Sequence, residues 1–95
     1  MADLGVTSAG SRPRLAPGVR LHFDKTRNAW ILLGPERVIE MEGPSHEILK
    51  RCDGTHSTAQ IVDELAALYN ADRSTIEDDV LALLAELATK RFVVR

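Results

Sequence analysis

The segment CDGTH, residues 52–56, gathers the side chains of this sequence that are best suited to chemistry. Cys52 is the only cysteine of the chain, and His56 follows four residues later. A thiol beside an imidazole can act as a nucleophile with its base, and the same two groups with Asp53 are of the types that bind zinc. Either use would make the chain an enzyme or a metalloprotein.

The same segment also fits a link between two helices. Gly54 stands two residues after Cys52, the last member of an apolar helical pattern, where a left-handed C-terminal cap favours glycine. Ser57 and Gln60 have the spacing of a capping box at the start of the next helix. A reactive thiol needs a partly exposed, electropositive setting, which this segment does not promise. We therefore interpret Cys52 as a core residue and predict no catalytic residue.

The remaining candidates for a metal or acid–base site are weaker. Zinc needs three or four ligands, and the two other histidines, His22 and His46, are isolated in the sequence. We expect no metal and no cofactor. The acidic run at 77–79 could supply a carboxylate pair, but we interpret it as part of the first turn of a helix, where the helix dipole favours negative charge. Either Ser74 or Asp72 would cap that helix.

The elements around these residues follow from the hydrophobic pattern. Three short runs of strand character come first and suit antiparallel hairpins, at residues 19–23, 29–33 and 37–41. The period then becomes helical, and we expect three helices: one after Gly43 and Pro44, one that begins after Ser57, and one over about 75–89. Residues 91–95 suit a short terminal strand. The order predicts an α+β fold, similar to a winged helix-turn-helix, over residues 18–95. Residues 1–17, rich in Gly, Ser, Ala and Pro, are expected to be a mobile tail.

Composition and charge narrow the function classes. The 95 residues are 44% apolar, which is enough for one small domain, and no apolar run approaches the roughly 20 residues of a membrane-spanning helix. A single cysteine fits the reducing cytoplasm. A winged helix normally reads DNA with its third helix, but the segment 75–89 holds four acidic residues and no lysine or arginine. We therefore expect no nucleic-acid partner and no membrane partner.

Peptide capture is the other use of such a fold. If the third strand is the sheet edge, its free backbone groups can pair with an extended peptide, and Leu83, Leu84 and Leu87 could form an apolar floor beneath it. These leucines could equally pack only the core. The free edge could also pair with a second copy, so the chain is expected to be a monomer or a strand-mediated homodimer.

Four segments carry a family resemblance: LLGPERVIEM, HEILKRCDG, STAQIVDEL and IEDDVLALLAELATKRFV. They resemble the pyrroloquinoline quinone (PQQ) biosynthesis protein D family, PqqD, over about residues 15–95. The segment MEGPSH departs from the family pattern where the lip of the groove would lie.

The resemblance implies a small peptide chaperone that is not an enzyme. It would bind the precursor peptide PqqA and present it to the radical SAM enzyme PqqE, which cross-links a glutamate and a tyrosine. Similar domains serve other modified-peptide pathways, which leaves such an adaptor as an alternative. In the family, the peptide adds a strand beside the third β-strand and packs on the third helix. Carried over to this sequence, the peptide-binding residues are Arg37, Val38, Ile39, Glu40, Met41, Asp79, Val80, Leu83, Leu84 and Leu87.

Overall fold

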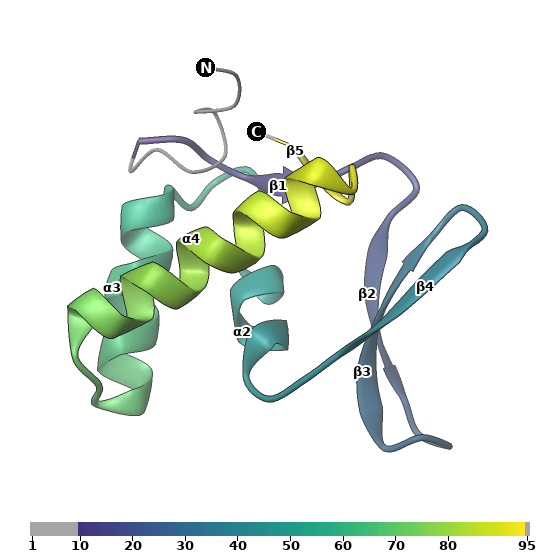
Figure 1. The fold of residues 1–95 in the computed structure, drawn as a ribbon, viewed down its shortest axis with the longest axis horizontal. Helices are drawn as coiled ribbons and strands as arrows, with labels where there is room; N and C mark the ends of the chain where they lie inside the picture. The colour runs from purple at the N-terminus through teal and green to yellow at the C-terminus, as the bar shows by residue number, and fades with distance from the viewer. Residues whose placement is uncertain (1–9, 95) are drawn as a thin grey trace.

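In the computed structural model, which describes residues 10–94, a three-stranded antiparallel sheet precedes three helices (Figure 1). The sheet has the order β2-β3-β4, so that β3 is central and β4 lies at an edge. Figure 1 shows α2 between the sheet and the pair α3 and α4. The strands are β2 (Arg20–Asp24), β3 (Ala29–Gly34) and β4 (Arg37–Met41), and the helices are α2 (Ser45–Lys50), α3 (Thr58–Tyr69) and α4 (Arg73–Thr89). The predicted α+β class and the predicted bounds of the third strand are confirmed.

The register of the sheet separates a core face from an outer face. Leu32 of β3 pairs with Leu21 on one side and with Ile39 on the other, so these three side chains share a face. Leu32 is fully buried in the core that the sheet shares with the helices. On β4, Ile39 lies on the core side and Val38 is exposed on the opposite side, as the alternation of the sequence predicts.

A second, two-stranded sheet joins the two ends of the described chain. β1 (Arg14–Leu15) pairs antiparallel with β5 (Val93–Val94), next to the C-terminal end of α4 in Figure 1. Pro13 is fully buried, and its carbonyl oxygen accepts a hydrogen bond of 3.1 Å from the backbone N–H of Gly54. The terminal strand is confirmed, but the expectation of a tail up to residue 17 is wrong for residues 13–15, which pack on the domain. The part of that expectation that concerns residues 1–9 lies outside the described residues.

The starts of α3 and α4 show which side chains cap these helices. The hydroxyl of Ser57 accepts from the backbone N–H of Gln60 at 3.1 Å, and the Gln60 side chain accepts from the N–H of Ser57 at 2.7 Å, which confirms the capping box. The Asp72 carboxylate accepts from the N–H of Thr75 at 3.2 Å, so Asp72 is the cap of α4. Because α4 therefore begins at Arg73, the acidic run at 77–79 lies beyond the first turn, and the expected dipole role for it is wrong.

The link between α2 and α3 has the expected turn but a different register. α2 ends at Lys50 with Arg51 as its cap, so Cys52 lies in the turn that follows rather than in the helix. Gly54 has a left-handed φ of 82°, three residues after the cap, and its N–H bonds to the N-terminal segment. The glycine thus shapes the loop rather than closing the helix.

Candidate functional site

The edge of β4 offers the free backbone that strand addition requires. One side of β4 pairs with β3 along its whole length, from Arg37 opposite Gly34 to Met41 opposite Trp30. Within residues 10–94, no other backbone–backbone hydrogen bond involves the residues of β4. Because alternate N–H and C=O groups of an edge strand point away from the sheet, β4 can accept a further strand.

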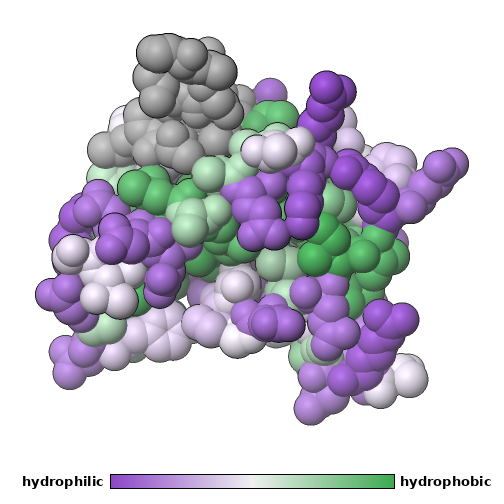
Figure 2. All heavy atoms as spheres, in the orientation of Figure 1, coloured by the Kyte–Doolittle hydropathy of each residue, from purple (hydrophilic) through white to green (hydrophobic). Residues whose placement is uncertain are grey.

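One side of α4 carries partly exposed aliphatic side chains. Ile76 and Leu83 are half-buried against the core, and Asp79 between them is exposed. Ile39 of β4 is half-buried against the same core. Positions 76, 79 and 83 share one side of a helix because each turn takes 3.6 residues. Figure 2 shows hydrophobic surface, in green, in the recess between α4 and the sheet, with hydrophilic side chains around it.

The structure divides the predicted site residues into two groups. Three of those on α4 are core residues, Val80, Leu84 and Leu87, with 0%, 0% and 2% of their surface exposed. Of the three leucines expected to form a floor, only Leu83 retains exposed surface. Met41 is also buried, at the end of β4. The residues that keep an accessible side chain are Arg37, Val38, Ile39, Glu40, Asp79 and Leu83.

Arg37 links the start of β4 to the end of α4. Its Nη1 donates a hydrogen bond of 2.6 Å to the carbonyl oxygen of Lys90, and its guanidinium lies 4.1 Å from the centre of the Phe92 ring. A cation over an aromatic face is stabilised by the charge distribution of the ring. These contacts fix one end of the space between β4 and α4.

A small apolar pocket opens beyond the other end of β4. It has a volume of about 110 Å³, below the roughly 300–1,000 Å³ of small-molecule sites, so it suits a single side chain rather than a cofactor. Its lining comes from all three helices and the turn before α2: Pro44, Ile48, Leu65, Tyr69, Ile76, Asp79 and Val80. Of these, the sequence predicted only Asp79 and Val80. The others were missed because spacing along the chain does not reveal which helix faces meet.

The segment around Cys52 forms no reactive site. Cys52 is 5% exposed, and its thiol donates to the Ile48 carbonyl oxygen at 3.4 Å. Burial, followed by the nearby charge of Asp53, raises the pKa of the Cys52 thiol to about 12, which opposes formation of a thiolate. The imidazole of His56 lies on the surface instead, 3.1 Å from Asp53 and 3.2 Å from Glu64.

Asp53 holds the loop together through several hydrogen bonds. Its Oδ1 accepts from the hydroxyl of Thr55 at 2.7 Å, from the backbone N–H of Thr55 at 2.8 Å, and from the backbone N–H of His56 at 3.2 Å. The hydroxyl of Thr55, followed by the His56 side chain, lowers the pKa of the Asp53 carboxyl well below its usual range. In the part of the chain that the structure describes, no cluster of three or more His, Cys, Asp or Glu side chains could hold a metal ion.

The charges on α4 bear on the DNA-binding alternative. Asp78, Asp79 and Glu86 are exposed on this helix. Its one cation, Arg73, lies at the first position and is paired with Asp63 at 2.7 Å. An acidic helix of this kind repels a phosphate backbone. Among residues 10–94, no helix has the length and apolar character needed to cross a membrane.

Comparison with known proteins gives matches over nearly the whole chain. Residues 29–93 match the family model described as coenzyme PQQ synthesis protein D (PqqD). A Rhodopseudomonas palustris protein named PqqA binding protein is 46% identical over 94 residues, which cover 98% of this chain and 92% of that protein. A Xanthomonas oryzae pv. oryzae protein of the same name is 49% identical over 83 residues, or 87% of this chain and 90% of that protein.

Two solved structures are also similar. The solution NMR structure of the PqqD truncation of Methylobacterium extorquens PqqCD is described as a functional, stand-alone recognition element for ribosomally synthesized and post-translationally modified peptides. It has a TM-score of 0.77 and 42% identity, over 94% of this chain and 98% of that one. The crystal structure of PqqD from Xanthomonas campestris has a TM-score of 0.59 and 46% identity, over 93% of this chain and 97% of that one.

Proposed function

Because this chain belongs to the PqqD family, we propose that it is a non-catalytic adaptor that binds a PqqA-like precursor peptide in pyrroloquinoline quinone biosynthesis. The names of its relatives and the description of the similar NMR structure support this function. The structural observation that carries it is the free edge of β4, together with partly exposed aliphatic side chains of β4 and α4 that pack on the same core.

The peptide binds as a fourth strand along Arg37–Met41. Main-chain hydrogen bonds to the free edge supply affinity that does not depend on sequence, and alternate side chains of the peptide supply specificity. Side chains on one face of the added strand contact Ile39 and Leu83. The link between Arg37 and Lys90 holds β4 and α4 in place on either side of the guest strand.

The pocket beyond β4 gives the peptide an anchor. Pro44, which follows β4 by three residues, forms part of its lining, so a peptide that runs along β4 reaches it. An aliphatic side chain fits the volume and the apolar walls. Burial of one such side chain contributes roughly 1.5–3 kcal/mol. Asp79 at the rim favours a basic residue next to it in the peptide.

The adaptor then presents the bound peptide to a PqqE-like radical SAM enzyme in the cytoplasm. Neither partner needs a reactive group from this chain, which agrees with the buried, neutral thiol of Cys52. The role is therefore to raise the effective concentration of the peptide at the enzyme.

Titration with a synthetic PqqA peptide from the same genome tests this function. Backbone amide shifts in an NMR titration should be largest within 37–41 and along the Leu83 side of α4. Trp30, the only tryptophan, pairs with Met41 and gives a second signal, since its emission should change when a strand adds next to β4. Shifts confined to α2 and α3, with 37–41 unchanged, would show that the binding site is wrong. No binding at millimolar peptide would show that the function is wrong.

A further inference from the structure

The proposed groove, formed by the free edge of β4 and the partly exposed side chains of α4, carries opposite charges at its two ends. At the start of β4, the exposed Arg37 is bonded to the carbonyl oxygen of Lys90, the residue that directly follows α4. Beyond the end of β4, Pro44 and Asp79 line the same apolar pocket. β4 and α4 therefore run past each other in opposite directions, with a cation at one end of the groove and a carboxylate at the other.

Arg37 is held in position and still keeps donors for a ligand. Its Nη1 donates to the carbonyl oxygen of Lys90, and its guanidinium lies over the ring of Phe92 at 4.1 Å from the ring centre. Within residues 10–94, no hydrogen bond uses its Nε or Nη2. These two nitrogens form one edge of the guanidinium, which matches the two oxygens of a carboxylate. A carboxylate can therefore bind Arg37 without breaking its contact with Lys90.

The strand geometry brings a side chain of the guest peptide to this edge. Arg37 and Ile39 share one face of β4, because alternate residues of a strand point to the same side. A guest strand places every second side chain on that face, one of them opposite Arg37 and the next opposite Ile39. Opposite charges that face each other across two strands attract, so an acidic peptide residue is favoured opposite Arg37.

The far end of the groove favours a basic side chain. Asp79 is exposed, and it is the only charged residue among those that line the pocket. Glu42, also exposed, follows β4 directly and adds a second negative charge at this end. The one cation of α4, Arg73, is already paired with Asp63 at 2.7 Å. A lysine or arginine of the peptide can lay its aliphatic stem along the apolar rim and place its charged head beside Asp79.

We propose that Arg37 and Asp79 set the direction of the bound peptide, Arg37 by pairing with one of its acidic side chains and Asp79 with one of its basic side chains. The inference rests on the proposed function. The five residues of β4 span about 14 Å and the pocket lies beyond them, so the two peptide charges are about four to six residues apart. Backbone pairing alone does not fix the direction, since an edge strand can accept a parallel or an antiparallel partner. The order of the two charges in the peptide selects one of them.

Double-mutant cycles between the full chain and the PqqA peptide from the same genome test this inference. In the peptide, each acidic residue is replaced in turn by its amide, and each lysine or arginine by glutamine. In the protein, Arg37→Gln and Asp79→Asn remove the two charges, whereas Arg37→Lys keeps the first. Isothermal titration calorimetry gives the affinities, and circular dichroism checks folding. Asp79 is exposed, so its cycle remains a test even if loss of the Lys90 contact unfolds Arg37→Gln.

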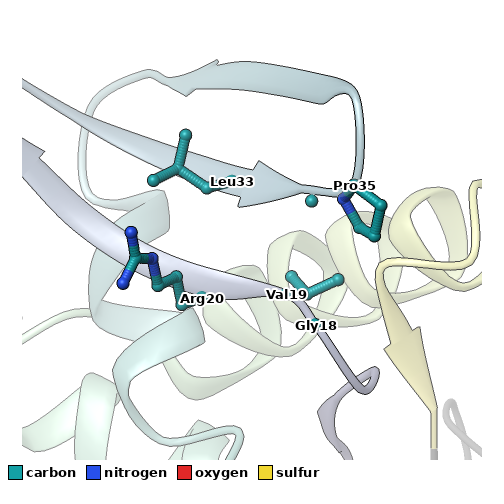
Figure 3. A pocket seen from close by; sticks show the side chains of 6 residues that line it. Gly18, Val19, Arg20, Leu33 and Pro35 are labelled. Atoms are coloured by element: carbon teal, nitrogen blue, oxygen red, sulfur yellow. The ribbon is translucent and has the colours of Figure 1, made fainter.

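Two matched controls remove the same charges outside the groove. Arg20→Gln removes an exposed arginine, which Figure 3 shows at the start of β2 near Leu33 of β3. Arg20 lies opposite Leu33, and Leu33 opposite Val38, so all three are on the outer face of the sheet. Asp78→Asn removes an exposed carboxylate next to Asp79 that does not line the pocket. Each control should leave peptide affinity within about twofold of the wild-type value.

We expect Arg37→Gln to lower the affinity for the unmodified peptide about five- to tenfold, and only about twofold once one particular acidic residue of the peptide has been neutralised. Asp79→Asn should couple in the same way to one basic residue, about four to six positions from that acidic residue. Arg37→Lys should still couple to the same acidic residue.

Equal losses for every form of the peptide would mean that Arg37 acts only through its contact with Lys90, and that Asp79 does not read the peptide. That result would overturn the inference and leave the proposed function intact. Losses in the two controls as large as those in the groove variants would overturn it as well, because the overall charge would then be the cause. A wild-type protein that binds no peptide would overturn the proposed function itself.

Discussion

The Cys52 thiol has one polar contact, its hydrogen bond to the Ile48 carbonyl oxygen, in otherwise apolar surroundings. Cys52→Ser should therefore destabilise the fold by about 1–3 kcal/mol, since a hydroxyl is more costly than a thiol to bury. Urea denaturation gives this difference. Peptide affinity of the folded variant should stay at the wild-type value, because Cys52 lies outside the proposed groove. Loss of binding in a variant with native circular dichroism would contradict the structural role.

The same thiol makes stability depend on alkaline pH. In the folded state the pKa of Cys52 is raised from 9.0 to about 12, so the unfolded chain loses this proton first. The stability it contributes is complete below pH 9 and is lost as the pH rises from 9 to 12. By pH 10.5 the loss should be about 2 kcal/mol. Comparing urea midpoints at pH 8 and pH 10.5 for the wild type and Cys52→Ala isolates this contribution; equal losses in the two proteins would show that the thiol is not the cause.

On the element scale, the Leu83 side of α4 is the part of the proposed groove that mutation tests best. Leu83→Glu places a charge against the guest strand, and because burial of an apolar side chain is worth roughly 1.5–3 kcal/mol, peptide affinity should fall at least about tenfold. Leu83 is half-buried, so the variant should still fold. Isothermal titration calorimetry with the synthetic peptide measures the change.

Ala85→Glu is the control for this prediction. Ala85 is exposed and lies two residues from Leu83, which is about 200° around the helix. The Ala85→Glu variant adds the same charge to the same helix, on the side away from Leu83. Its peptide affinity should stay within about twofold of the wild-type value. If both variants lost affinity equally, the cause would be the overall charge of α4 rather than contact at Leu83.

The elements with a repeating pattern could be predicted from the sequence. The alternation in RVIEM gave both the bounds and the faces of β4, and the capping box fixed the start of α3. β1 could not be predicted, because two residues show no period and their partner β5 lies at the other end of the chain. The start of α4 depended on Asp72 and Ser74, two residues of equal capping tendency, so only the geometry could choose between them.

The proposed site could likewise be predicted only in part from the sequence. The edge strand follows from local pattern, but the pocket beyond it requires the packing of α2, α3 and α4 on one another. The i, i+4, i+7 stripe of α4 could not distinguish core residues from groove residues. Leu83 and Leu84 are adjacent in sequence, yet Leu84 is fully buried while Leu83 retains exposed surface. Adjacent residues of a helix point about 100° apart, so one can face the core while the next faces the surface. Which of the two faces the core depends on the orientation of the helix.

At the scale of the whole molecule, charge and fold point to different partners. The order of a sheet and three helices is compatible with winged-helix DNA-binding proteins, whereas the net charge is −2 and the exposed charges of α4 are acidic. DNA affinity depends on cations that neutralise phosphates, so the charge should decide. In a fluorescence anisotropy titration at physiological salt, duplex DNA should show at most weak, non-specific binding. The PqqA peptide should bind under the same conditions. Nanomolar, sequence-specific binding of DNA would contradict the expectation that this domain has no nucleic-acid partner.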